Sequence, residues 1–252
     1  ITAIAGKWHL CRFGDYPGDH LKECGFDEYC CWYKSEEDGD EKYSRYKDPA
    51  IWQDGKVRIE KGKYGPDVFF EFAKDFITKN KEKPFFLYYP QVLVHKPHAL
   101  PPGSKDKSKA NAFPAMVDYM DKEVGKIVQV LDDLKLREKT LIVFSGDNGT
   151  DISITSKIKG DVEIKGGKGS VTETGTHVPL IASWKGTTPT GVVLKDLVDF
   201  SDLLPTFAEI GGANLPKGVT IDGRSFAPHL LGKKGTPREW VFSQLGNNKL
   251  IR

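Results

Sequence analysis

The residues best suited to chemistry are in the stretch Ser145-Gly146-Asp147-Asn148-Gly149, directly after a short apolar run at residues 140–144. The β-branched and apolar side chains of that run predict a buried strand. Asp147 and Asn148 would then lie at the carboxyl end of the strand, where open α/β sheets bind ligands. A carboxylate beside a carboxamide oxygen suits a hard cation such as Ca²⁺ or Mg²⁺. Taken alone, the stretch favours an Asp-Asn-Gly turn without a ligand, and only the other blocks of the chain reverse that preference.

Two groups suited to binding an anion lie near the start of the chain. Lys7 and His9 follow a strand predicted at residues 2–6. Because they are two positions apart, an extended backbone directs both to the same side. An ammonium and an imidazole on one side could bind a tetrahedral anion. By themselves these two residues favour the alternative of a surface lysine and a core histidine.

A histidine pair follows a second strand predicted at residues 84–89, which we also expect to be buried. The pair is His95 and His98, in the segment His95-Lys96-Pro97-His98. Prolines on both sides of His98 restrict the backbone and could hold its imidazole in place. We interpret this exit from the strand as a candidate site.

Lys168 lies among glycines, in Gly166-Gly167-Lys168-Gly169-Ser170. The segment is superficially similar to a phosphate-binding loop. It lacks the four-residue spacing of that motif, and no clear helix follows it, so a nucleotide site is not expected. The glycines would instead allow the backbone and the Lys168 ammonium to approach a ligand closely.

Composition describes a globular chain of 252 residues with 38% hydrophobic and 29% charged residues. The net charge of +2 gives no field that points to nucleic acid, and no apolar run approaches the ~20 residues of a membrane span. Neither nucleic acid nor membrane is therefore expected as a partner. The four cysteines are Cys11, Cys24, Cys30 and Cys31. Their spacing is not that of a zinc site, and we expect thiols with at most one disulfide.

The remaining pattern alternates strands with helices. Apolar residues at helical spacing predict helices that start at Gly65-Pro66-Asp67 and at Phe113, the second reaching Leu134. Further elements are expected as a strand at residues 178–183, a helix at 202–210 capped by Ser201, a short helix at 225–231 and a strand at 240–245. Residues 11–65 read as long loops with a strand at 56–60, and residues 152–164 read as a polar loop. This alternation predicts an α/β fold with a mostly parallel sheet and helices on both faces.

Four blocks in a fixed order make the chain similar to the sulfatase family of the alkaline-phosphatase-like superfamily. They are Gly6-Lys7-Trp8-His9-Leu10, the block at residues 84–98, Ser145-Gly146-Asp147-Asn148-Gly149, and Gly167-Lys168-Gly169-Ser170 with Glu173 and Val178-Pro179-Leu180. Two weaker signatures are Asp202-Leu203-Leu204-Pro205-Thr206 and Asp222-Gly223-Arg224-Ser225. The resemblance implies a partial catalytic domain at residues 1–239 and the start of a small carboxy-terminal subdomain at residues 240–252. The fold would thus be incomplete at both ends.

The resemblance also implies a role for each charged candidate. Lys7 and Lys168 would hold the oxygens of a sulfate group, where cations stabilise developing negative charge. Asp147 and Asn148 would supply half of a Ca²⁺ or Mg²⁺ site.

The histidines take the remaining roles that the resemblance implies. His9 would hydrogen-bond the hydrated aldehyde of the nucleophile. His98 would contact the leaving oxygen as a general acid, with His95 as the alternative. His177 receives no role from the pattern.

The departures from the family pattern are informative. The formylglycine nucleophile of the family arises from Cys-x-Pro-Ser-Arg, and no such motif exists in this chain. The paired aspartates of the first strand are also missing, Cys11 replaces a usual glycine, and Thr174 replaces the first glycine of a usual Glu-Gly-Gly. We therefore expect a sulfate ester hydrolase whose activity in this chain alone is little or none. The family further implies a sulfated small molecule or glycan as substrate and an exported, periplasmic or extracellular location.

Two alternatives stay open. A phosphodiester or phosphonate hydrolase of the same superfamily would use the same metal ligands and lysines. A degenerate homologue that binds sulfated glycans would explain the missing nucleophile. Drift to the latter should also have eroded Lys7, His9, Asp147, Asn148 and Lys168, so we rank it last.

Overall fold

A computed structural model describes residues 1–10, 20–33 and 44–252. Its contacts divide the chain into two compact units, Ile1–Leu136 and Arg137–Arg252, and each is described by itself. None of the helices in the described ranges has the length and apolar character needed to cross a membrane. Cys11 lies outside the described ranges, and Cys24 and Cys30 are free thiols.

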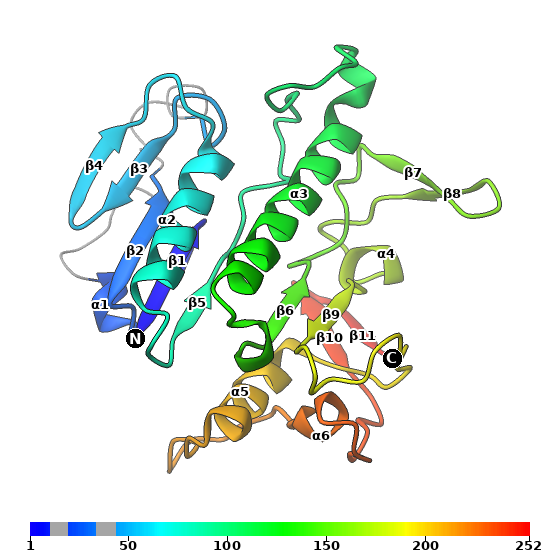
Figure 1. Cartoon of the computed structure of the whole chain (residues 1–252). Helices are drawn as coiled ribbons and strands as arrows, with labels where there is room; N and C mark the ends of the chain where they lie inside the picture. Colours follow the sequence, from blue (N-terminus) through cyan, green and yellow to red (C-terminus); the bar gives the residue numbers. More distant parts are fainter. Residues whose placement is uncertain (11–19, 34–43) are drawn as a thin grey trace. The chain divides into compact units, whose positions relative to one another are not determined.

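The first unit is built on a five-stranded sheet with the order β4-β3-β2-β1-β5 (Figure 1). Strand β1 pairs in parallel with β2 and β5, and β3 and β4 extend the sheet antiparallel beyond β2. The bounds are β1 (Thr2–Gly6), β2 (Glu28–Trp32), β3 (Ala50–Gln53), β4 (Lys56–Ile59) and β5 (Phe86–Tyr88), with a short α1 (His20–Glu23) before β2. The predicted α/β class is confirmed.

Helix α2 (Gly65–Lys79) packs against β1 and β2 through one apolar face. Phe69, Ala73, Phe76 and Ile77 on that face are buried. Pro66 stands in the first turn, where its missing N–H costs no intrahelical hydrogen bond. The helix predicted to open at Gly65 is therefore confirmed. Burial of these side chains is the main force that holds the helix on the sheet.

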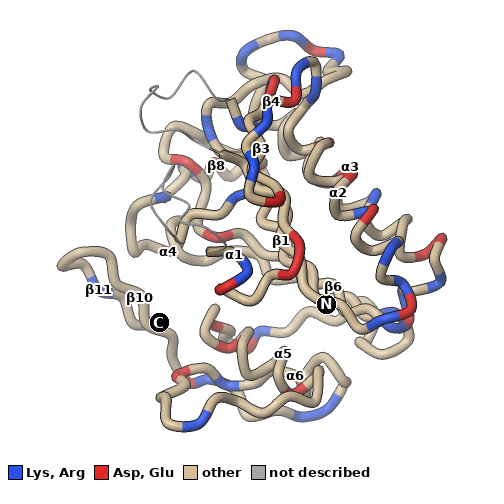
Figure 2. Tube along the Cα trace, turned by 90° about the vertical axis from the view of Figure 1, so that its left-hand side faces the viewer, with Lys and Arg blue, Asp and Glu red and all other residues tan. Residues whose placement is uncertain are grey.

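The second long helix, α3 (Ala112–Asp133), packs on α2 and follows a short 3₁₀ turn, η1 (Lys109–Asn111). Its predicted bounds are confirmed to within one residue. Acidic and basic residues are interspersed along both helices (Figure 2). Between them the Tyr119 hydroxyl donates to Asp67 Oδ1 at 2.7 Å, and Lys126 Nζ lies 3.8 Å from the same oxygen. Within α3, Lys126 Nζ donates to Glu123 Oε1 at 2.7 Å. Polar groups therefore help fix the register of the two helices.

The second unit contains three two-stranded sheets and short helices. Strand β6 (Ile142–Ser145) pairs antiparallel with β9 (Leu180–Ser183). The other elements are η2 (Arg137–Lys139), β7 (Thr155–Ile158), β8 (Val162–Lys165), α4 (Glu173–Thr176), η3 (Phe200–Asp202), α5 (Leu203–Gly211), α6 (Ala227–Leu230), β10 (Phe242–Leu245) and β11 (Asn248–Ile251). The predicted strands at 140–144, 178–183 and 240–245 and the predicted helices at 202–210 and 225–231 are thus present.

Several expectations from the sequence are wrong. The long loops expected at residues 11–65 contain β2 and β3, and the polar loop expected at residues 152–164 is the β7–β8 hairpin. Ser201 is not the cap of this helix. The N-cap residue of α5 is Asp202, and Asp199 caps the preceding turn η3, where its side chain accepts from the backbone N–H of Ser201. The strands at residues 84–89, 140–144 and 178–183 were expected to be buried, but β5, β6 and β9 are partly exposed. In β5 this follows from its position at the edge of the sheet.

Glu123 gives a testable pH dependence for the first unit. Its side chain is fully buried, and burial raises its pKa above 4.5 although the bond from Lys126 opposes that shift. A carboxyl whose pKa is raised by folding stabilises the fold below its unfolded value of 4.5, and this stabilisation is lost as pH rises through the folded value. We predict that Glu123→Gln removes this loss and raises the melting temperature at pH 8 by about 2–4 °C relative to wild type.

Thermal denaturation between pH 4.5 and 8 measures the difference between the two proteins. Asp121→Asn is the matched control, because Asp121 lies on the same helix and is exposed. It should leave the pH dependence unchanged. A Glu123→Gln variant that is less stable than wild type at pH 8 would instead mean that the ionised carboxylate, paired with Lys126, stabilises the packing of α2 on α3.

Candidate active-site residues

In the first unit, the lysine block, Gly6-Lys7-Trp8-His9-Leu10, is held at the end of β1. The backbone N–H of Lys7 donates to the carbonyl of Pro90 at 2.8 Å, so the segment after β1 is tied to the segment after β5. Gly6 has φ = 123°, and a Cβ at this position would lie 2.1 Å from the Pro90 carbonyl oxygen. Only glycine permits this approach. Lys7 is half-buried and His9 is exposed.

His95 and His98, in the block at residues 84–98 of the same unit, have different surroundings. His95 Nδ1 lies 2.6 Å from the carbonyl oxygen of Lys96. Since a carbonyl only accepts, Nδ1 carries the proton. The His98 ring packs edge-on against Phe113 with centroids 5.2 Å apart, and its Nε2 is buried without a hydrogen-bond partner among the described residues. Which of the two is the general acid stays a prediction.

In the second unit, the loop that carries Asp147 and Asn148 packs against the turn of α4. The backbone N–H of Gly149 donates to the Gly175 carbonyl at 2.9 Å, and a Cβ on Gly149 would lie 1.9 Å from the Thr174 carbonyl oxygen. The Asp147 side chain is exposed, and Asn148 is half-buried. The loop is therefore fixed through its backbone, which leaves the oxygen-bearing side chains available.

The loop of Lys168 is attached to the same place. The Lys168 backbone N–H donates to the Thr150 carbonyl at 3.0 Å, and the N–H of Gly166 donates to Ile154 at 2.9 Å. The structure thus brings the backbone at Lys168 next to the residues that directly follow Asp147 and Asn148. These three candidates share one loop cluster of the second unit. That Lys7, His9 and His98 of the first unit face the same pocket stays a prediction.

An exposed ionic group lies on α4 beside this cluster. Glu173 Oε1 is 2.5 Å from His177 Nδ1, and Arg252 Nη1 contacts both carboxylate oxygens at 2.7 Å. The hydrogen bond from His177 is the main reason why the pKa of Glu173 is lowered. His177, which had no predicted role, is therefore a partner of Glu173.

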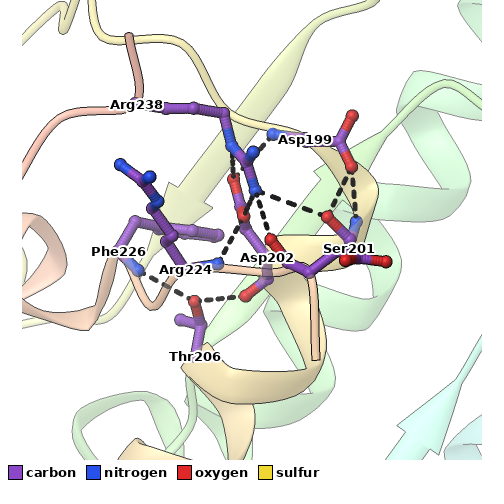
Figure 3. A network of polar contacts seen from close by, with 8 residues as sticks. Asp199, Ser201, Asp202, Thr206, Arg224, Phe226 and Arg238 are labelled. Atoms are coloured by element: carbon purple, nitrogen blue, oxygen red, sulfur yellow. Dashed lines mark hydrogen bonds and ion pairs between the residues drawn. The ribbon is translucent and has the colours of Figure 1, made fainter. Parts of the chain in front are cut away.

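A buried ionic network joins the two weaker sequence signatures (Figure 3). Asp202 accepts from the Arg238 guanidinium and from the backbone N–H of Arg224 at 2.7 Å and Asp199 at 2.8 Å. Burial alone would raise the pKa of Asp202, but these hydrogen bonds outweigh it and lower the pKa. The Thr206 hydroxyl donates to the Asp202 carbonyl and accepts from the Phe226 N–H. Both carboxylate oxygens of Asp202 accept from donors of the second unit, which indicates a structural role.

Two important residues gave no signal in the sequence. Tyr46 lies in the stretch that was read as loop, and its hydroxyl contacts the backbone of the histidine block. Arg238 is one of 37 basic residues and stands in no motif. Only the fold shows what either residue contacts.

Described residues include no group of three or more His, Cys, Asp or Glu side chains that could hold a metal ion. Asp147 and Asn148 nevertheless supply oxygen ligands of the kind that Ca²⁺ and Mg²⁺ prefer. They fit part of such a site. The remaining ligands would have to come from other groups.

Comparisons with known proteins agree on one family. The family model described as Sulfatase matches residues 2–213. Human arylsulfatase A is 34% identical over 69% of this chain, and N-acetylgalactosamine-6-sulfatase of Canis lupus familiaris is 30% identical over 94%. The crystal structure of Ps i-CgsB, at 27% identity, covers the whole chain with a TM-score of 0.78. The chain spans 34% of that arylsulfatase, 48% of the canine relative and 60% of the Ps i-CgsB chain.

The close approach at Gly149 predicts a sensitive position. Gly149→Ala should push the Asp147 loop away from α4 and destabilise the second unit by about 1–3 kcal/mol, because the new Cβ overlaps a backbone carbonyl. Thermal denaturation and amide exchange at residues 146–150 measure the effect. Gly211→Ala is the control, since Gly211 is the last residue of α5 and a Cβ there has nothing within 4 Å. Equal behaviour of the two variants would contradict the packing described.

The Asp202 network predicts a larger loss. Arg238→Ala leaves a carboxylate buried without its partner, and this should cost about 3–5 kcal/mol. Because the folded pKa of Asp202 is lowered, the stabilisation in wild type is present above the unfolded value of 3.8 and is lost as pH falls through the folded value. Denaturant unfolding at pH 7 measures the change. Lys157→Ala removes only an exposed pair with Glu163 at 3.8 Å, so it should change stability by less than about 0.5 kcal/mol. Similar losses in both variants would show that the network carries little stability.

Proposed function

Because the chain belongs to the sulfatase family, we propose that it serves in the hydrolysis of sulfate esters. The observation that carries this proposal is the family match over residues 2–213. The matched range includes the positions of Lys7, Lys168, the candidate histidines and the Asp147-Asn148 pair. The packing of the Lys168 loop against the Asp147 loop supports it, because an anion and its metal need neighbouring ligands.

Lys7 and Lys168 are proposed to bind the oxygens of the sulfate group. Ammonium groups held by a fixed backbone stabilise charge that develops on these oxygens when the ester bond breaks. The backbone N–H groups of both lysines are bonded to carbonyls of other loops, so neither lysine starts from a flexible segment. Such preorganisation lowers the cost of orienting a charge during the reaction.

Asp147 and Asn148 are proposed to hold part of a Ca²⁺ or Mg²⁺ site. Calcium takes six to eight oxygen ligands, so these two would be a minority of them. The metal, when bound, supplies positive charge next to the sulfate oxygens. The chain's own contribution is to fix the loop through Gly149 and Gly175.

Proton transfer is assigned to the histidines. His98 is proposed to protonate the leaving oxygen, with His95 as the alternative, and His9 to hydrogen-bond the hydrated aldehyde. The formylglycine nucleophile is not present in this chain, so we propose that the chain alone has little or no activity.

The substrate class is proposed from the relatives. Two are N-acetylgalactosamine 6-sulfatases, from Canis lupus familiaris and Bacteroides thetaiotaomicron, and Ps i-CgsB was crystallised in complex with k-i-k-neocarrahexaose. A sulfated glycan or a sulfated small molecule fits this group. We further propose an exported location for the protein that performs this reaction.

The experiment begins with the coding DNA on the 5′ side of Ile1, where we expect Cys-x-Pro-Ser-Arg in frame. Protein from that complete frame is assayed with 4-nitrophenyl sulfate and 4-nitrophenyl phosphate in parallel. We predict faster sulfate turnover and a roughly 10²–10³-fold loss of kcat in Lys168→Ala. Lys185→Ala, a lysine outside the matched blocks, is the control and should keep the activity.

Three outcomes would contradict the proposal. Faster phosphate turnover would favour a phosphoester hydrolase. An upstream frame without Cys or Ser at the nucleophile position would remove the sulfatase reaction. Glycan binding by the chain without any turnover by the complete protein would favour the binding protein.

A further inference from the structure

We infer that Tyr46 is a positioning residue that fixes the histidine turn, residues 90–98, which bears His95 and His98. Tyr46 is 3% exposed, and its hydroxyl lies 3.0 Å from the Val92 carbonyl oxygen and also contacts the carbonyl oxygen of His95. One phenolic hydrogen is therefore shared between two carbonyl groups of the turn.

The two contacts close the turn on itself. The His95 N–H also donates to the Val92 carbonyl, at 3.3 Å. The Tyr46 hydroxyl therefore contacts the carbonyl groups at both ends of the turn from Val92 to His95. The turn's own hydrogen bond, at 3.3 Å, is long. Without the phenol, the carbonyl of His95 would lose a buried partner, which costs free energy unless the turn moves to reach another donor.

Tyr46 is itself fixed to the helix that supports the sheet. The first residue of α2, Gly65, donates its N–H to the Tyr46 carbonyl at 2.6 Å, and the Tyr46 ring stacks on Tyr64 with centroids 6.0 Å apart. Burial raises the pKa of the Tyr46 hydroxyl, so the phenol stays protonated and remains a donor. The path of contacts runs from α2 through Tyr46 to the histidine turn.

The opposite end of the turn is held by the lysine block. Lys7 N–H donates to Pro90, at the first residue of the turn. Carbonyls 90, 92 and 95 are therefore each bonded to a donor from outside the turn or across it. That this positioning serves proton transfer by His95 or His98 rests on the proposed function. The clamp itself, meaning the two contacts of the Tyr46 hydroxyl with the carbonyls of Val92 and His95, does not rest on it.

The test is made on the chain as it stands, by ¹H–¹³C NMR of the imidazole groups and by amide exchange. In Tyr46→Phe we expect the signals of His95 and His98 to shift by more than their linewidth and the His95 amide to exchange about tenfold faster. Signals of His20, His177 and His229 should stay in place. Unchanged His95 and His98 signals would overturn the inference.

Tyr119→Phe is the matched control. Tyr119 belongs to the same aromatic group through its edge-on contact with Tyr64, but its hydroxyl donates to Asp67 rather than to the turn. It should lower stability without moving the His95 or His98 signals. If it moves them as Tyr46→Phe does, the effect is a general loss of packing and the clamp is rejected.

A measurement on the wild-type chain covers the case in which Tyr46→Phe does not fold. The buried Tyr46 hydroxyl proton should exchange slowly enough to be observed, with nuclear Overhauser effects to Val92 and His95. A hydroxyl proton that exchanges with solvent at once, or that lies near neither residue, would overturn the clamp. Because no turnover is measured, failure of sulfate ester hydrolysis in the complete protein would leave this result intact.

Discussion

Backbone contacts that leave no room for a side chain hold the loops that bear the candidate residues. Gly6 brings the end of β1 against Pro90, and Gly149 brings the Asp147 loop against Thr174. In both places a backbone hydrogen bond accompanies the close approach. These contacts are made by backbone atoms and do not use the side chains of Asp147 and Asn148. This division allows charged groups to be placed for a ligand while the fold is stabilised by other residues.

The pKa of a buried carboxyl group is shifted in opposite directions in the two units. Glu123 is buried with one amine partner and one oxygen without a partner among the described residues, and burial raises its pKa. Asp202 accepts from a guanidinium and two backbone N–H groups, which keep it ionised. The contribution of Glu123 to stability is therefore lost as pH rises, and that of Asp202 is lost as pH falls. The number of donors around each carboxyl, rather than burial alone, decides the sign.

The sequence predicted the long elements well because their apolar periodicity is strong. Helices α2 and α3 are found where Val68 to Ile77 and Phe113 to Leu134 required them. It failed at β2 and β3, since short apolar runs among glycines and charges cannot be told from loops. The sequence predicted Ser201 as the cap because serine and aspartate are both good caps. Only the fold shows that the Asp199 side chain accepts the hydrogen bond from the Ser201 N–H at the start of η3.

The candidate site was predictable as a list of residues but not as a set of contacts. Motif order located Lys168 and Asp147, and the structure then placed their loops together. No pattern could have found Tyr46, because its contacts join positions 46 residues or more apart in the chain. Long-range contacts of this kind depend on the fold rather than on local composition.

The proposed function requires, as the sequence predicts, that Lys7, His9 and His98 share one anion site with Asp147, Asn148 and Lys168. A crystal structure of the complete protein with inorganic sulfate tests it most directly. The account predicts one sulfate whose oxygens contact the ammonium groups of both Lys7 and Lys168, next to a metal held by Asp147 and Asn148. Lys7 and Lys168 on opposite faces of the protein would contradict it.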